Sequence, residues 1–90
     1  MAIQWEVIYS GRVQSVGFRA TVLHFARKYR VTGFVRNQRD GTVELVVEGL
    51  EAEIEALLAD IRERFNRNLT GESSHRSEPK GEYTGFEIRS

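Results

Sequence analysis

The stretch IQWEVIYSGRVQSVGFRATVLHFARKY, residues 3–29, changes its hydrophobic period midway. Its first part alternates, which predicts a strand with one buried face that ends at Gly11. The residues on the apolar side are Ile3, Trp5, Val7 and Tyr9. From Phe18 onward, apolar residues recur three and four positions apart, which predicts an amphipathic helix that ends near Arg30. The segment GRVQSVGFR, residues 11–19, joins the strand to the helix.

The middle of the chain predicts a β-hairpin followed by a second helix. Two β-branched and aromatic runs in residues 32–49 flank Asp40–Gly41, a pair suited to a tight turn because glycine readily adopts a positive φ. Apolar residues at helical spacing then run from Glu51 to Phe65. The outer face of this helix is acidic early and basic late, which matches the helix dipole.

The C-terminal part is polar and less regular. The alternation in Leu69–Ser77 is poor, so we expect a frayed edge strand or a mobile loop there. Phe86 and Ile88 share one face of a short closing strand. The order of elements predicts an α+β domain over residues 1–90 with the ferredoxin-like split βαβ layout. In this layout two helices cover one face of a mostly antiparallel, four- to five-stranded sheet.

Composition excludes several classes of protein. Thirteen basic and thirteen acidic residues give a formal net charge of +0, so the basic excess of a general nucleic-acid binder is missing. The chain has no cysteine, which excludes disulfides, thiolate nucleophiles and cysteine-bound metals. No apolar run is long enough to cross a membrane, and the alternating N-terminus does not resemble a signal peptide. We therefore expect a cytoplasmic monomer without nucleic-acid or membrane partners.

The joining segment has the chemistry of an oxyanion site. A loop that enters a helix N-terminus presents free main-chain N–H groups and the positive end of the helix dipole. Arg19 lies in the first helical turn, where a cation is mildly unfavourable unless an anion sits between it and these N–H groups. A guanidinium binds two oxygens of a phosphoryl or carboxylate group. The alternative is a glycine-containing loop that only turns the chain.

Asn37 is a second candidate. It ends the first strand of the hairpin, so it is either a turn asparagine that bonds its own loop or a site residue. In the split βαβ layout, the joining loop and the hairpin turn lie at the same end of the sheet. The Asn37 amide is therefore expected near any anion bound by the loop.

Two segments resemble the signatures of the acylphosphatase family. GRVQSVGFR is similar to the pattern G-x-V-Q-G-V-G-F-R, and GFVRNQRDGTVE is similar to G-[WF]-V-x-N-x-x-D-G-x-V-E. Every fixed position but one agrees, and the two segments occur in the family's order and at its separation. The closing YTGFEIRS also resembles the family's last strand.

The resemblance implies an enzyme that hydrolyses the carboxyl-phosphate bond of small acyl phosphates to a carboxylate and phosphate. It places the substrate's phosphate on the loop residues Gln14, Ser15, Val16, Gly17, Phe18 and Arg19. It gives Arg19 and Asn37 the catalytic roles, with Asn37 orienting the attacking water. It further implies no metal, no cofactor and no covalent intermediate, and the sequence does not identify the physiological acyl phosphate.

The chain departs from the family pattern at two places. Ser15 stands where the family usually has glycine, and a positive φ there would cost serine about 1–2 kcal/mol. The Ser15 hydroxyl could instead donate to phosphate or act as a nucleophile, although no base is visible for the second role. The polar Leu69–Glu78 segment stands where the family has a strand with regular apolar alternation, so this departure bears on the edge strand and not on the site.

Two other functions are weighed against hydrolysis. One is a non-catalytic anion-binding or regulatory module of the same fold, which would not need both Arg19 and Asn37. Its form as one part of a larger carbamoyl-phosphate-processing protein is not expected for a chain of 90 residues. The other is RNA binding, which would need exposed aromatic residues on the central strands, and TVELVVEG has none.

Overall fold

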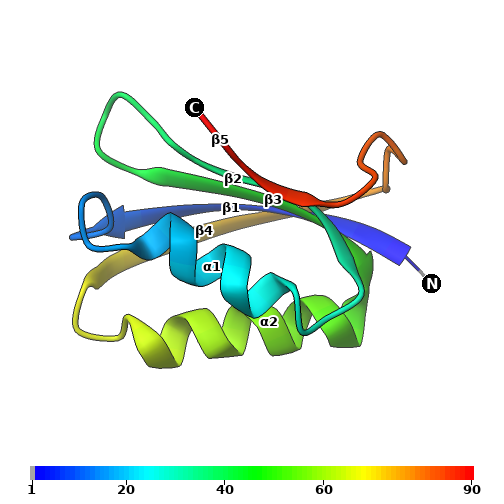
Figure 1. The fold of residues 1–90 in the computed structure, drawn as a ribbon, viewed down its shortest axis with the longest axis horizontal. Helices are drawn as coiled ribbons and strands as arrows, with labels where there is room; N and C mark the ends of the chain where they lie inside the picture. Colours follow the sequence, from blue (N-terminus) through cyan, green and yellow to red (C-terminus); the bar gives the residue numbers. More distant parts are fainter. Residues whose placement is uncertain (1) are drawn as a thin grey trace.

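The computed structural model describes residues 2–90, which form one layer of strands and one layer of helices (Figure 1). The elements, in chain order, are β1 (Ala2–Gly11), α1 (Phe18–Ala26), β2 (Val31–Asn37), β3 (Val43–Leu50), α2 (Glu51–Arg64), β4 (Leu69–Ser77) and β5 (Phe86–Arg89). Both helices pack against the same face of the sheet. Neither of these two helices is long and apolar enough to cross a membrane.

The sheet has five strands in the order β4-β1-β3-β2-β5. Neighbouring strands are antiparallel except β2 and β5, which are parallel. The first and third strands are central, and each helix connects two consecutive strands that are not neighbours in the sheet. This arrangement confirms the predicted α+β, ferredoxin-like split βαβ layout with five strands.

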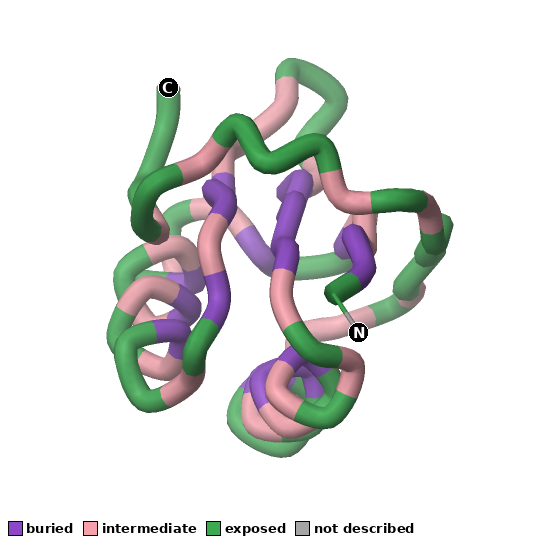
Figure 2. The backbone as a smooth tube through the Cα atoms, turned by 90° about the vertical axis from the view of Figure 1, so that its right-hand side faces the viewer, coloured by how far each residue is buried: buried purple, intermediate pink, exposed green. Residues whose placement is uncertain are grey.

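The core lies between the sheet and the helices, and alternate strand positions supply it. Figure 2 shows the buried positions along the strands and on the sides of the helices that face them. Buried strand residues include Val7, Tyr9, Val35, Val43, Leu45 and Val47, and buried helix residues include Val22, Ile54, Leu57 and Ile61. Trp5, expected in the same row, is only partly buried and packs at the margin of the core. The two hydrophobic periods of the sequence therefore meet in one core.

Phe18 anchors the beginning of α1. Its ring packs against Tyr9 and Phe65, with ring centroids separated by 5.2 Å and 4.6 Å respectively. Burial of Tyr9, and to a lesser extent the nearby charge of Glu72, raises the pKa of the Tyr9 phenol well above its ordinary value. Tyr9 is thus a neutral core residue, and the contacts among the three tilted rings fix where the N-terminus of α1 meets the sheet.

Helix α1 ends earlier than the apolar period suggested. The prediction of an end near Arg30 is wrong, because the α-helix stops at Ala26 and residues 27–30 form tighter turns. In these turns Lys28 N–H donates to Phe25 O at 3.0 Å, and Tyr29 N–H donates to Ala26 O at 3.1 Å. Since such turns keep a near-helical spacing, Tyr29 still packs against the core.

Leu69–Ser77 forms β4, which lies at the edge of the sheet, so the edge position is confirmed and the expectation of fraying or of a mobile loop is wrong. It pairs with β1 along its length, with one irregularity at Ser10/Gly11. Leu69 packs against the core, and Arg62 Nη2 of α2 lies 2.7 Å from Glu72 Oε2 of β4. Main-chain pairing and ion pairs therefore hold a strand whose side chains are mostly exposed.

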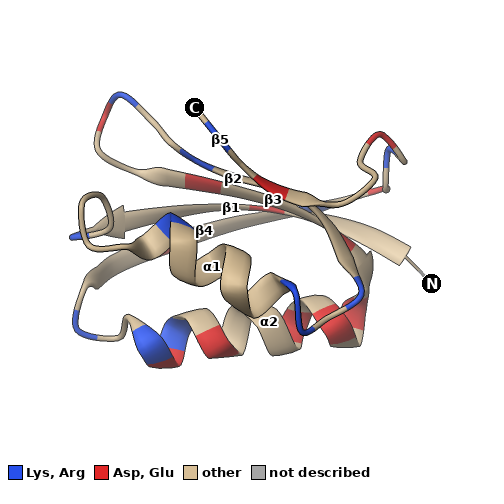
Figure 3. Ribbon diagram, viewed as in Figure 1, with Lys and Arg blue, Asp and Glu red and all other residues tan. Residues whose placement is uncertain are grey.

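Charges on α2 follow its dipole. Glu51 and Glu53 lie in its first turn, and Arg62 and Arg64 lie in its last (Figure 3). Each sign is placed where the helix end favours it. Helix α1 differs, because its first turn contains no acidic residue. The N-terminus of α1 is thus left electropositive, which is where the candidate site lies.

Candidate active site

The β1–α1 loop and the β2–β3 turn lie at the same end of the sheet, as predicted (left in Figure 1). Asn37 is the last residue of β2 and follows Val35 at a spacing of two. Since alternate strand residues point to the same face, Asn37 continues the row that faces the helices. It therefore turns toward the N-terminus of α1 rather than toward the open face of the sheet.

A hollow of about 200 Å³ lies between the loop, α1 and the strand ends. Its lining residues are Val13, Ser15, Gly17, Phe18, Arg19, Ala20, Asn37 and Ile88. Arg19 and Asn37, 18 positions apart in the sequence, thus line one hollow. This juxtaposition is what the two sequence segments predicted.

The six predicted loop residues do not all line this hollow. Ser15, Gly17, Phe18 and Arg19 do, although the Phe18 side chain is buried in the core and only its main chain is available. Val16 packs against the core instead. The Gln14 side chain reaches across to the β2–β3 turn.

The loop presents unused main-chain donors. Within residues 2–90, no main-chain N–H of residues 14–19 donates to a protein acceptor. These groups belong to the segment that enters α1, where the helix dipole also favours an anion. The hollow can therefore accept several oxygens of a tetrahedral oxyanion.

Arg19 supplies the only charge among the lining residues. Its guanidinium forms no ion pair or hydrogen bond within residues 2–90. No Asp, Glu or His lines the hollow, and residues 2–90 contain no cluster of three such side chains suited to a metal. The arginine is thus free to form a bidentate contact with a phosphoryl or carboxylate group.

The Asn37 amide oxygen is unused as well. Its Oδ1 atom is buried and has no hydrogen-bond partner among the described residues. A buried amide oxygen without a partner is unfavourable unless a donor is supplied by a ligand or by water. The turn-asparagine alternative is therefore not supported, since this oxygen does not bond its own loop.

The backbone of the loop is left-handed at two positions. Ser15 has φ 66°, and Gly17, at the N-cap of α1, has φ 77°. A positive φ is what the family glycine at position 15 would provide, so the serine keeps the loop shape at some cost in strain. Ser15 is the only non-glycine residue with positive φ within residues 2–90.

Ser15→Gly is expected to raise the free energy of unfolding by about 0.5–1 kcal/mol. Relief of a left-handed serine is worth about 1–2 kcal/mol, and the larger entropy of glycine in the unfolded chain offsets part of it. Urea denaturation measures the change. The matched control is Ser73→Gly on the extended, exposed strand β4, which should destabilise by about 0.5–1 kcal/mol. Equal destabilisation by both changes would contradict the strain at Ser15.

A second hollow of about 340 Å³ adjoins the first and is lined by Arg36, Asn37, Gln38, Arg39 and Ser90. Arg36 is not a free cation, because its Nε lies 2.6 Å from Glu44 Oε1 on the neighbouring strand. Arg39 is exposed and has no ion pair within residues 2–90. Of Arg36 and Arg39, only Arg39 therefore has an unpaired charge that makes the electrostatic potential beside the hollow more positive.

Sequence reasoning missed three lining residues, which are Val13, Ala20 and Ile88. Val13 and Ala20 flank the predicted loop and could have been inferred from its length. Ile88 comes from β5, where it lies opposite Val35 in the parallel pairing with β2. That strand order was not specified by the sequence, so nothing in the local pattern indicated Ile88.

Comparisons with known proteins agree with this geometry. A family model described as acylphosphatase matches residues 5–88. An acylphosphatase from Haloarcula marismortui is 43% identical over 85 residues, or 93% of this chain and 92% of the relative. One from Synechococcus sp. is 44% identical over 87 residues, or 97% and 93% of the two chains. The crystal structure of acylphosphatase from Bacillus subtilis superposes with a TM-score of 0.87 at 30% identity, covering 98% and 99%.

The fold and the hollow define a class, the small ferredoxin-like α+β proteins with an anion-receptive site at the entry of the first helix. Within that class the family match covers nearly the whole chain. The chain belongs to the acylphosphatase family and is an enzyme of that family. The resemblance carried by GRVQSVGFR and GFVRNQRDGTVE is thereby confirmed.

Proposed function

We propose that this enzyme hydrolyses small acyl phosphates at the carboxyl-phosphate bond without a metal ion, a cofactor or a covalent intermediate. The observation that carries the proposal is the content of the hollow. It combines unused N–H groups, an unpaired arginine and an unpartnered amide oxygen, and its lining includes no acid or base. The proposed enzyme is one domain over residues 1–90 and acts as a cytoplasmic monomer.

The phosphoryl group is held by the loop. Main-chain N–H groups within residues 14–19 and the Arg19 guanidinium surround its oxygens and oppose their charge as it spreads in the transition state. These donors are in place before substrate binds, so little reorganisation accompanies the reaction. Electrostatic stabilisation of this kind is the larger part of phosphoryl-transfer catalysis.

The attacking water is held by Asn37. Its free Oδ1 atom accepts a hydrogen bond from the water, which turns an oxygen lone pair toward phosphorus. The new P–O bond forms as the bond from phosphorus to the carboxylate oxygen breaks. The proton released by the water passes to an oxygen of the phosphoryl group itself, so no protein base takes part.

The absence of an acid from the lining sets the substrate class. A departing alkoxide or phenoxide needs a proton, whereas a carboxylate, with a pKa of about 4, leaves without one. The hollow offers no Asp, Glu or His to protonate a poor leaving group. Acyl phosphates are therefore favoured over phosphate monoesters.

A non-catalytic anion-binding module is the second candidate. Unused N–H groups and Arg19 would serve it equally well. Asn37 does not fit this role, because an amide oxygen repels an anion and is useful only when a donor such as water lies between them. The unpartnered oxygen therefore favours hydrolysis.

The experiment compares benzoyl phosphate with p-nitrophenyl phosphate in the presence of EDTA, and uses inorganic phosphate as an inhibitor. We expect turnover of benzoyl phosphate, competitive inhibition by phosphate, and no p-nitrophenyl phosphate hydrolysis above buffer. Phosphate binding without turnover would support the binding module. The Ser15→Gly variant should retain turnover. Loss of turnover in this variant would instead support Ser15 as a nucleophile.

A further inference from the structure

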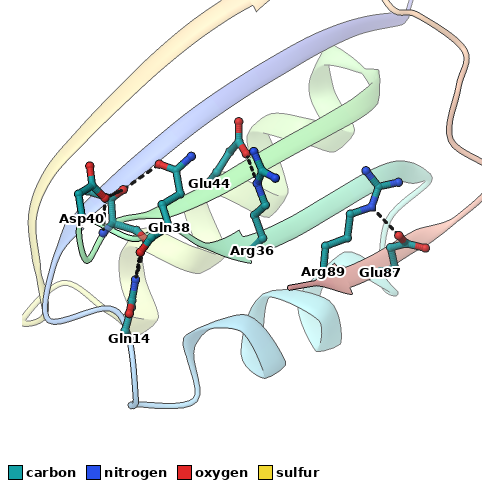
Figure 4. A network of polar contacts seen from close by, with 8 residues as sticks. Gln14, Arg36, Gln38, Asp40, Glu44, Glu87 and Arg89 are labelled. Atoms are coloured by element: carbon teal, nitrogen blue, oxygen red, sulfur yellow. Dashed lines mark hydrogen bonds and ion pairs between the residues drawn. The ribbon is translucent and has the colours of Figure 1, made fainter.

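The Gln14 side chain crosses from the loop to the β2–β3 turn (Figure 4). Its Nε2 donates to Gln38 O at 2.8 Å and to Thr42 O at 2.9 Å. The two acceptors lie 24 and 28 residues further along the chain. Since a carboxamide nitrogen has two hydrogens, both donors of Gln14 are committed to the hairpin and none is left for a phosphate.

The hairpin that receives these bonds is closed by its own contacts. Gln38 N–H donates to Thr42 O at 2.8 Å, and Gly41 N–H donates to Gln38 O at 3.2 Å. Asp40 Oδ1 accepts from Thr42 N at 3.0 Å, and the Thr42 hydroxyl and amide hold the pKa of Asp40 below its ordinary value. The turn is therefore held in one conformation by its own hydrogen bonds, and the Gln14 side chain bonds the β1–α1 loop to it.

The Gln14 hydrogen bonds connect the two segments that form the site, the β1–α1 loop and the end of β2. Gln14 directly precedes Ser15 of the hollow, and Gln38 directly follows Asn37. The N–H groups that would hold phosphate and the amide that would hold water lie on separate segments of the chain. Within residues 2–90, the Gln14 amide provides the side-chain hydrogen bonds that link these segments.

We propose that Gln14 is a positioning residue that fixes the distance between the phosphate loop and Asn37, and that its side chain does not bind the phosphate. The inference rests on the proposed function. In-line attack requires the water to lie about 3–3.5 Å from phosphorus and opposite the leaving group, and a displacement of about 1 Å can lower the rate about 100-fold. Releasing the loop from the hairpin therefore impairs the chemical step more than the binding of phosphate.

Gln14→Met tests this, because methionine has a similar length and no donors. We expect kcat for benzoyl phosphate to fall about 10- to 100-fold while the inhibition constant of inorganic phosphate changes less than about threefold. The matched control is Gln4→Met, which removes the hydrogen bond from a buried glutamine on β1 to Ser77 of β4, about 20 Å back along β1 from Gly11. Its kcat should equal that of the wild type.

A double-mutant cycle with Asn37→Ala gives the decisive readout. If Gln14 acts through Asn37, the double variant is no slower than Asn37→Ala alone. Independent effects that multiply would overturn the inference, as would a phosphate inhibition constant that rises in step with the fall in kcat.

Gln14→Asn, which keeps the amide but is one methylene too short, should lose activity in the same way and serves if Gln14→Met does not fold. An active wild type with an unimpaired Gln14→Met overturns this inference alone, whereas an inactive wild type overturns the proposed function as well.

Discussion

Arg19→Ala is expected to lower kcat/KM for benzoyl phosphate about 100- to 1,000-fold, equivalent to about 3–4 kcal/mol of transition-state stabilisation. Among the described residues that line the hollow, Arg19 is the only charged one, so no second cation there can replace its guanidinium. Steady-state kinetics measures the loss. Arg19→Lys keeps the charge but not the planar pair of donors, so it should recover only part of the rate.

Stability should respond to Arg19→Ala differently from activity. The side chain makes no ion pair or hydrogen bond within residues 2–90, and its charge lies at the helix end that disfavours cations. We expect the free energy of unfolding to stay equal or to rise by about 0.3–0.5 kcal/mol. Arg27→Ala, at the other end of α1, is the matched control and should keep full activity. Equal kinetic losses in both variants would contradict a specific role for Arg19.

Asn37→Ala should abolish most of the turnover while phosphate still binds. Without the amide oxygen the water is no longer held in line, and we expect kcat to fall about 100- to 1,000-fold. The inhibition constant of inorganic phosphate should change less than about threefold, because the loop donors and Arg19 remain. Kinetics with phosphate as the inhibitor separates the two effects.

Two further variants sharpen the test of Asn37. Asn66→Ala removes an exposed asparagine beyond α2 and should behave as the wild type. Asn37→Asp keeps an acceptor for water but adds a negative charge beside the phosphoryl group, so it should weaken phosphate binding as well as turnover. A loss of phosphate affinity in Asn37→Ala as large as its loss of kcat would show that Asn37 binds the anion instead.

The central architecture was predictable because β1 carried the hydrophobic period of a strand, and α1 and α2 carried that of a helix. Val7 and Tyr9 are buried as their alternation required, and Ile54 and Ile61 are buried as helical spacing required. The sequence also indicated that Arg19 and Asn37 share one end of the sheet. The order of strands places both at the hollow, so topology was sufficient there without side-chain detail.

Other features depend on contacts that no local pattern records. Strand β4 is held through its main chain and through pairs such as Arg62 with Glu72, and neither leaves an alternating signature. The end of α1 was misjudged because Tyr29 still faces the core from a turn. The role of Gln14 depends on carbonyl groups 24 and 28 residues away, which only the folded chain brings within reach.

The most direct test of the mechanism is hydrolysis of benzoyl phosphate in ¹⁸O-labelled water with EDTA present, with the isotope measured in both products by mass spectrometry. Attack on phosphorus by a water held at Asn37 puts the label into phosphate and leaves benzoate unlabelled. We expect turnover well above the buffer rate with this distribution. Label in benzoate, or no rate above buffer, would contradict the proposed reaction at the hollow formed by Arg19 and Asn37.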